Sequence, residues 1–144
     1  MNSETPRQLL PREIALISRR WRARLDERMR HTGLTQSRWH ALLELAKSPE
    51  PLTQRELAER VGVEGPTLVR QLDDLQRQGL IERCPVEGDR RANNVRLTPR
   101  AQPLIAELTA IADELRAELL QDVSDEELAQ VLAVLRRVSA RLDQ

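Results

Sequence analysis

One stretch, from Thr53 to Leu80 (TQRELAERVGVEGPTLVRQLDDLQRQGL), constrains the fold of this chain more than any other. Thr53 is followed three residues later by Glu56, which is the spacing of a capping box at the start of a helix. Gly62 comes after this short helix, and a tight turn between two packed helices often needs a glycine. The order of these signals predicts a helix-turn-helix.

The second helix of this unit is predicted to have an apolar side and a polar side. Gly65 and Pro66 open it, because proline fits the first turn of a helix, and Gly79 ends it. Residues at helical spacing face the core: Leu68, Leu72 and Leu75. Polar residues occupy the other side: Thr67, Arg70, Gln71 and Asp74.

The polar side carries residue types that read base edges in DNA. Arg70 can pair with guanine, Gln71 with adenine, and Thr67 with either a base edge or a phosphate. The plainer alternative is a solvated helix face without a ligand, which is what most such faces are. The residues after Leu80 favour the DNA-reading interpretation, because they have the pattern of a wing.

Two short strands are predicted after the helix-turn-helix. Leu80–Cys84 and Val95–Leu97 are strand-like, Pro85 is expected to stop the first, and residues 86–94 are expected to form a long polar tip. Leu52 is expected to form a one-residue strand in front of the helix-turn-helix. A hairpin directly after a helix-turn-helix is the arrangement of a winged helix.

Helices flank the winged segment, which we place at residues 35–98. A first helix is expected within residues 8–32, with Pro11 in its first turn, and two more within 99–144. All three carry apolar stripes. One chain could bury one of these stripes, and a second chain is the better explanation for burying all three. The prediction is a single domain, residues 1–144, of mainly α (α+β) class. It is a winged helix-turn-helix whose N- and C-terminal helices form the dimerisation base of a homodimer.

The composition favours helices and contains no pattern of catalytic residues. The chain has no Phe or Tyr and two Trp, so aliphatic side chains must do the packing. His31 and His40 are its only histidines, no His, Cys or carboxylate cluster has metal-ligand spacing, and no Gly-rich phosphate loop is present. We therefore expect no enzyme, no cofactor and no metal site.

The formal net charge is zero, but charge is unevenly distributed. Residues 83–100 lean basic and residues 102–144 lean acidic, and such local clustering is compatible with DNA binding. Cys84 is the only cysteine, so an intrachain disulfide is excluded. With neither a signal peptide nor a long apolar run, the protein is expected in the cytoplasm.

The run from Asp89 to Thr98 (DRRANNVRLT) matches the wing pattern D-x-R-x-x-x-x-x-L-T of MarR-type regulators. Three further blocks, LTQSRW from Leu34, PTLVR from Pro66 and LTPRAQPLI from Leu97, resemble the SlyA branch of that family. The resemblance spans nearly the whole chain, and the blocks agree in order and spacing. Many MarR-type proteins have glycine where this chain has alanine in the last block, and the SlyA branch tolerates alanine there.

The resemblance implies a triangular homodimer that binds a pseudo-palindromic site on double-stranded DNA. Its recognition helix is expected at about residues 65–78. Pro66 and Thr67 would then lie against base edges or phosphates, and Arg70 would read or clamp the major groove.

The resemblance also assigns roles to the wing. Arg90 is expected to enter the minor groove, because a narrow minor groove concentrates negative potential and attracts arginine. Asp89 would position that arginine through ion pairs, and Arg91 would contact the DNA backbone.

A small-molecule effector is a further implication of the resemblance. Members of the family often respond to small aromatic carboxylates such as salicylate, and in the SlyA branch the positions that match Arg19 and Trp39 line the binding site. A guanidinium for the carboxylate and an indole for the ring are chemically suited to this ligand. The alternative places Trp39 in the core and Arg19 in a surface ion pair.

Two other functions stay open for a winged-helix dimer. The first is a redox-sensing regulator that uses Cys84, although only the neighbouring Arg83 favours a reactive thiol and a packed structural cysteine is the simpler explanation. The second is a protein-interaction module without specific DNA binding, because a fold does not dictate a function. A steep weakening of binding by salt would distinguish DNA binding from such a module.

Overall fold

The computed structural model describes residues 3–144, except for the side chains of Arg90 and Arg91. It contains two compact units, Met1–Ile111 and Ala112–Gln144, and the division falls within one long helix. Over the described residues the fold is mainly helical, with one small antiparallel sheet of three strands. This architecture confirms the predicted mainly α (α+β) winged-helix class.

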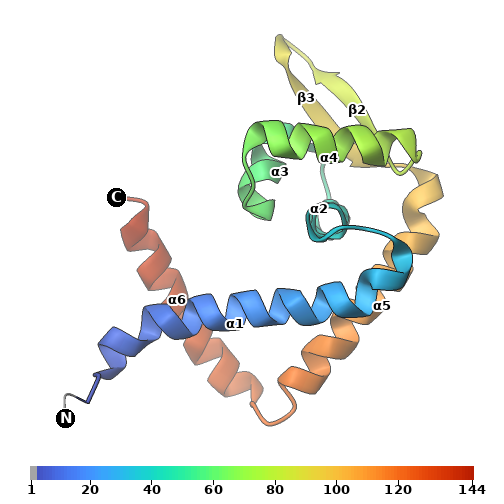
Figure 1. The fold of residues 1–144 in the computed structure, drawn as a ribbon. Coiled ribbons are helices and arrows are strands. Elements are labelled where there is room, and N and C mark those ends of the chain that lie inside the picture. The colour runs from blue at the N-terminus through green and yellow to red at the C-terminus, as the bar shows by residue number, and fades with distance from the viewer. Residues whose placement is uncertain (1–2) are drawn as a thin grey trace. The chain divides into compact units, whose positions relative to one another are not determined.

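The elements can be followed along the chain in Figure 1. Short 3-10 turns at Arg30–Thr32 and Pro99–Ala101 precede α2 and α5. The bounds of the helices and strands, in chain order, are α1 Pro6–Met29, α2 Gln36–Lys47, β1 Leu52–Thr53, α3 Gln54–Val61, α4 Gly65–Arg77, β2 Ile81–Val86, β3 Asp89–Leu97, α5 Gln102–Leu119 and α6 Asp125–Leu142.

The first helix begins earlier than predicted. Thr5 is the N-cap of α1, and its hydroxyl accepts from the amide of Gln8 at 3.3 Å while the Gln8 side chain accepts from the Thr5 amide at 2.8 Å. This capping box satisfies two of the free amides at the start of a helix. Pro11, expected in the first turn, therefore lies inside the helix.

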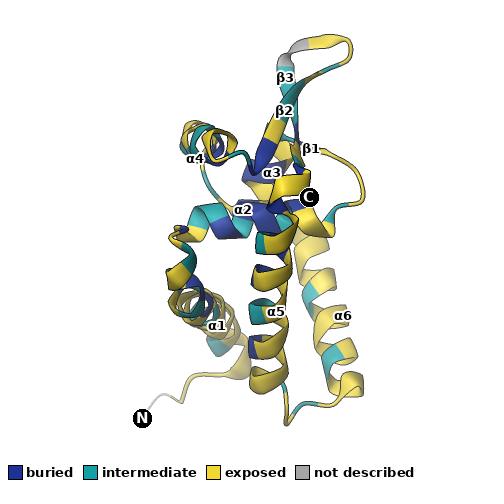
Figure 2. Cartoon of the chain, turned by 90° about the vertical axis from the view of Figure 1, so that its right-hand side faces the viewer, coloured by how far each residue is buried: buried dark blue, intermediate teal, exposed yellow. Residues whose placement is uncertain are grey.

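The core of the first unit lies where α2, α3 and α4 pack together and against the sheet. Figure 2 shows this buried surface on α2, on α3 and on the strands beside them. The buried side chains of these helices and strands are aliphatic apart from one tryptophan, as the composition predicted. The largest fully buried side chains of these elements are Trp39, Leu42, Leu57, Leu68, Leu72, Leu75, Ile81 and Val95.

The sheet has the order β1-β3-β2, so β3 is central and β2 is an edge strand. Leu52 pairs with Val95, which confirms the predicted short strand before the helix-turn-helix. The predicted long polar tip of the hairpin is wrong, because β2 continues through Pro85 to Val86 and β3 already begins at Asp89. An edge strand tolerates a proline, since one side of its backbone has no hydrogen-bond partner to lose.

The hairpin is closed by a short turn and an irregular register. Glu87 and Gly88 form the turn, and Gly88 has a φ of +83°, which a residue with a side chain rarely adopts. Pairing shifts between Pro85 and Val86, so the β3 strand bulges near its start. A bulge of this kind twists the end of a hairpin and re-aims its side chains.

The second unit consists of the end of α5 and the whole of α6. Ser124 and Glu127 form a capping box at the start of α6, with both reciprocal bonds at 3.1 Å, as predicted. None of the α6 side chains is fully buried in the single chain. Its exposed large apolar side chains are Val131, Leu132, Val134, Val138 and Leu142.

Replacing Thr53 by alanine is expected to destabilise the first unit by about 1 kcal/mol, the usual cost of a lost N-cap. The amide of Glu56 donates to the Thr53 hydroxyl at 3.1 Å, and the Glu56 carboxylate accepts from the Thr53 amide at 3.2 Å. Hydrogen bonds from the Thr53 hydroxyl and the Thr53 amide to the Glu56 carboxylate lower the pKa of Glu56. The stability that these two bonds contribute is present above the ordinary carboxyl range and is lost as the pH falls through the lowered pKa.

Urea denaturation at neutral pH measures the effect of the cap. Thr109, which is exposed in the middle of α5, provides the matched control substitution to alanine. An equal loss in the two variants would show that the Thr53 hydroxyl contributes nothing as a cap.

Candidate nucleic-acid interface

The helix-turn-helix is formed by α3, a three-residue turn and α4. Gly62 ends α3 with a φ of +78°, and the amides of Gly62 and Val63 both donate to the carbonyl of Ala58, at 2.8 and 3.2 Å. A glycine fits here because residues with a Cβ are strained at this φ. The structure confirms the predicted capping box, turn glycine and second helix.

The second helix of the unit, α4, ends where it was predicted to end. Arg77 is its last residue, Gln78 is the C-cap, and Gly79 follows with a φ of +76°. The amide of Leu80 donates to the carbonyl of Leu75 at 3.0 Å, so the chain turns back at once into the wing. The side chain of Thr98 also donates to the Gly79 carbonyl, at 2.5 Å.

The four predicted DNA-reading residues of α4 differ in how far they are exposed. Pro66 and Arg70 are exposed, whereas Thr67 and Gln71 are half-buried. Arg70 makes no side-chain hydrogen bond or ion pair with any described residue. The Gln71 carbonyl oxygen is buried and has no hydrogen-bond partner in the described part of the chain, so Gln71 is less available to a ligand than Arg70 is.

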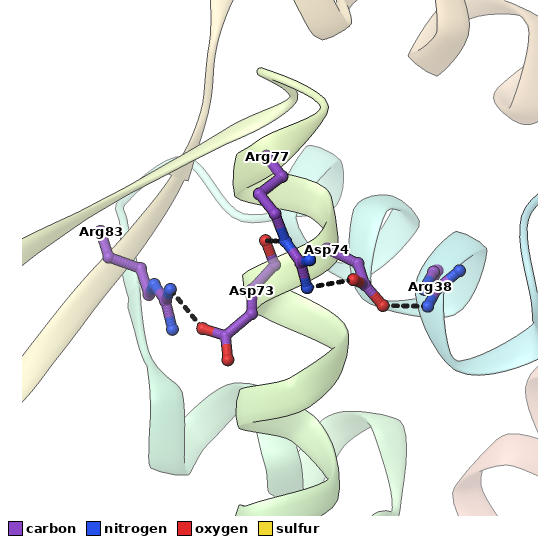
Figure 3. Close-up of polar contacts among 5 residues, drawn as sticks. All are labelled: Arg38, Asp73, Asp74, Arg77 and Arg83. Carbon is purple, nitrogen blue, oxygen red and sulfur yellow. Dashed lines mark hydrogen bonds and ion pairs between the residues drawn. The ribbon is translucent and has the colours of Figure 1, made fainter.

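Two ion pairs hold the last turn of α4 from two directions, as Figure 3 shows. Asp73 accepts from Arg83 of β2 at 2.6 Å, and Asp74 accepts from Arg38 of α2. Asp74 also accepts from Arg77 at 2.5 Å. We call the Arg38–Asp74 and Asp73–Arg83 pairs the α4 ion pairs.

The α4 ion pairs were not predicted from the sequence. Asp74 was placed on the outward polar side, whereas the structure pairs it with a residue 36 positions earlier. One signal in the sequence was informative, because two consecutive carboxylates in the last turn of a helix are disfavoured by the helix dipole. Such a pair indicates that cations lie nearby.

An open hollow of about 770 Å³ lies between the helix-turn-helix and the wing. Gln54 and Arg55 of α3, Gly65 and Val69 of α4, and Asn93 of β3 are among the residues that line it. Glu64, the N-cap of α4, makes no side-chain capping bond, so the first amides of that helix are not satisfied by a cap. Free amides at a helix N-terminus suit a phosphate group.

Three residues of the wing were predicted to act in DNA binding: Asp89, Arg90 and Arg91. The side chains of Arg90 and Arg91 lie outside the described residues, so their predicted roles stay predictions. Asp89 is exposed and is among the residues that line the hollow. The backbone nevertheless places positions 90 and 91 at the start of β3, in the bulged end of the hairpin.

Within the described residues, no group of three or more His, Cys, Asp or Glu side chains could hold a metal ion. None of the described helices is both long and apolar enough to span a bilayer. Cys84 is a free, half-buried thiol in β2, opposite Asn94 of β3.

Comparison with solved structures identifies the family. The transcriptional regulator PA3341 has 48% sequence identity and a TM-score of 0.88, over 93% of this chain and 98% of that chain. A family model described as MarR family matches residues 32–92. The chain belongs to the MarR family of transcriptional regulators.

Two other relatives extend the comparison within the MarR family. A MarR-family transcriptional regulator from Silicibacter pomeroyi is 28% identical, with a TM-score of 0.84 over 94% of this chain and 90% of that chain. S. aureus MepR in a DNA-binding conformation is 29% identical, with a TM-score of 0.82 over 92% and 98%. A MepR–DNA complex gives 28% identity and a TM-score of 0.75 over 96% and 99%.

The predicted effector residues of this MarR-family chain occupy different environments. Trp39 is 1% exposed, and its Nε1 donates to Asp26 at 3.1 Å. Arg19 lies on the exposed side of α1. The buried indole agrees with the alternative that Trp39 is part of the core, so a ligand at this position would need the surrounding side chains to move.

Proposed function

We propose that this MarR-family chain is a sequence-specific regulator that binds double-stranded DNA as a homodimer. One observation carries the proposal. The exposed side of α4 presents an unpaired arginine, Arg70, and the same helix lines, through Gly65, Leu68 and Val69, a hollow that the wing strand borders. The relative of known structure with bound DNA, MepR, supports the same ligand.

Each predicted residue of α4 has its own contact with DNA in this proposal. Arg70 donates in bidentate fashion to guanine O6 and N7 in the major groove. Gln71 pairs with adenine after its side chain turns outward, because its carbonyl oxygen is buried in the free chain. Pro66 and Thr67, in the first turn, lie against base edges or phosphates. The amides of Gly65 and Thr67 in the first turn of α4 can donate to a phosphate, since Glu64 makes no side-chain capping bond there.

The wing completes the contact with DNA. Arg90 enters the adjacent minor groove, Asp89 positions it, and Arg91 contacts the backbone. The short turn at Gly88 supports this arrangement, because the bulged β3 strand directly follows it and carries both arginines.

A homodimer places two recognition helices on one duplex. The exposed apolar side chains of α6 form a row on one face of that helix, and α1 also exposes large apolar residues, namely Leu10, Ile14 and Ile17. Such faces are costly in water and are buried when two identical chains pack together. Two-fold symmetry then requires a pseudo-palindromic operator with half-sites roughly 34 Å apart, about one helical turn.

Selection of bound sequences from a random pool of duplexes tests the function. We expect an enriched inverted repeat, and we expect the logarithm of the affinity for it to fall linearly with the logarithm of the salt concentration. Failure to enrich any sequence, with weak binding that salt does not change, would support a protein-interaction module instead.

We also propose a SlyA-like response to a small aromatic carboxylate at Arg19 and Trp39. The Arg19 guanidinium supplies the charge complement for the carboxylate, and Trp39 supplies an aromatic surface if its burial is relieved. The ligand weakens DNA binding only to the extent that it prefers one spacing of the two lobes over another.

Salicylate is therefore expected to weaken operator binding of the unmodified protein by about 5–150-fold, the usual range for coupled sites. Arg19→Gln removes the carboxylate contact and should abolish most of this response without changing the affinity measured in the absence of salicylate. Arg24→Gln, another exposed arginine of α1, is the matched control. Fluorescence anisotropy of a labelled operator measures the affinity of each protein with and without salicylate. An unchanged affinity of the unmodified protein in the presence of salicylate would contradict the proposal.

A further inference from the structure

The recognition helix is fixed in this lobe by two kinds of contact. Its apolar residues Leu68, Leu72 and Leu75 are buried at 1%, 0% and 0% exposure. Apolar packing is not directional, so it sets the depth of a helix more strictly than its rotation about its own axis. The α4 ion pairs are directional, and they act at the last turn of the same helix.

The two acids of the α4 ion pairs lie on different sides of α4. Asp73 and Asp74 are consecutive, and consecutive residues are about 100° apart around a helix. Figure 3 shows Asp73 directed toward Arg83 of β2 and Asp74 directed the other way, toward Arg38 of α2. A rotation of α4 in either direction therefore lengthens at least one of the two contacts.

The Arg38–Asp74 pair is the more enclosed of the two. The two arginines are similarly buried, at 22% exposure for Arg38 and 20% for Arg83, but Asp74 is 32% exposed whereas Asp73 is 45% exposed. The Arg38 Nε is buried and has no hydrogen-bond partner among the described residues. Asp74 is thus the acceptor that holds Arg38, and removing Asp74 leaves the partly buried charge of Arg38 unpaired. Removing Arg38 leaves Asp74 paired only with the exposed Arg77, which lies on α4 itself and does not connect the helix to α2.

The position of α4 matters for the contacts that Arg70 would make. Arg70 lies about one turn before Asp73 and Asp74 on the same helix. A rotation of about 20° moves a point at side-chain radius, about 5–6 Å from the axis, by about 2 Å. A shift of this size breaks a bidentate hydrogen bond, whose donor–acceptor distances span only about 2.7–3.2 Å.

We propose that Arg38 and Asp74 are positioning residues for sequence recognition, acting on Arg70 through the orientation of α4. They stabilise the helix orientation in which the Arg70 guanidinium meets a guanine edge. This inference rests on the proposed function, since it concerns how the same interface discriminates between sequences. It predicts a loss of discrimination without a loss of phosphate contacts.

The test uses Arg38→Gln, Asp74→Asn and the double variant in the full-length protein. Each is measured against a selected operator and a scrambled duplex over a range of salt concentrations. The ratio of the two affinities should fall about tenfold in each single variant and no further in the double variant, because the two residues act as one coupled unit. The salt slope should stay unchanged, since neither residue contacts a phosphate.

Control variants separate positioning from general damage. Arg116→Gln removes a different ion pair, to Asp113 at 2.7 Å, and should leave the ratio unchanged. Arg38→Lys keeps the charge, so its ratio of operator affinity to scrambled-duplex affinity should lie between those of Arg38→Gln and the unmodified protein. Circular dichroism and urea denaturation confirm that each variant is folded.

Three results would overturn the inference. A shallower salt slope in Arg38→Gln would make Arg38 a phosphate contact. An unchanged affinity ratio in folded single variants would make the pair purely structural, with the proposed function intact. An unmodified protein without sequence preference would overturn the proposed function first, and this inference with it.

Discussion

Introducing arginine at Val131 and Val138 together is expected to lower the affinity for an inverted-repeat operator by about 10²–10⁴-fold, the gain that linking two binding modules usually provides. Both side chains are exposed on the same side of α6, at 52% and 41%. Placing two charges in an apolar interface leaves them desolvated and facing their own copies across a two-fold axis. The chain should remain folded, since α6 has no fully buried residue to disturb.

A matched variant controls for added charge. Ala129 and Ala140 are exposed on the opposite side of α6, and replacing both by arginine adds the same charge without entering the proposed interface. Sedimentation equilibrium and operator affinity are measured for both double variants. A valine variant that stays dimeric, or a monomeric variant with full operator affinity, would contradict the role of this face.

Replacing Arg70 by alanine is expected to cost about 1–3 kcal/mol of binding to the operator, which is roughly a 5–150-fold loss of affinity. The lost affinity should come from the one base pair that Arg70 reads. Substituting that base pair should therefore lower the affinity of the unmodified protein and leave the affinity of the variant unchanged. The fold should not change, because Arg70 is exposed and makes no contact that stabilises the lobe.

Other arginines calibrate this result. Arg116→Ala should not change the affinity, because Arg116 pairs with Asp113 on α5, outside the helix-turn-helix. Arg90→Ala and Arg91→Ala, measured separately, identify which wing arginine discriminates between A·T-rich and G·C-rich flanks and which only contributes to the salt slope. If Arg70→Ala lowers the affinity for all DNA sequences equally, Arg70 contacts a phosphate and does not read a base.

Local signals account for the parts of the fold that were predicted well. The capping boxes at Thr53 and Ser124 and the turn glycine Gly62 each act within a few residues, so their effect can be read from the sequence alone. The helical spacing of the leucines of α4 is local in the same sense, and all three are buried.

Tertiary context explains what was mispredicted. Pro85 was expected to end its strand, but it lies in an edge strand, and strand order is not visible in a single sequence. The late start predicted for α1 is an exception with a local cause, because Thr5 and Gln8 have the spacing of a capping box that the prediction did not use.

The candidate site also contains features that the sequence predicts and features that only the folded chain shows. The outward-facing residues Pro66 and Arg70 follow from the helical period, and the structure exposes both. The partners Arg38 and Arg83 come from α2 and β2, and only the folded chain brings them to the last turn of α4. The burial of Trp39 was likewise left open, because periodicity assigns a residue to a face without saying how much of that face is covered.

Two copies of the chain must bind one face of a duplex together for the proposed recognition to operate. The most direct test compares the selected operator with a variant carrying five extra base pairs between its half-sites, about half a turn of DNA. We predict that the insertion lowers the affinity to about that of a single half-site, because it places the second half-site on the opposite face of the duplex. An affinity that does not change with the insertion would contradict the symmetric dimer.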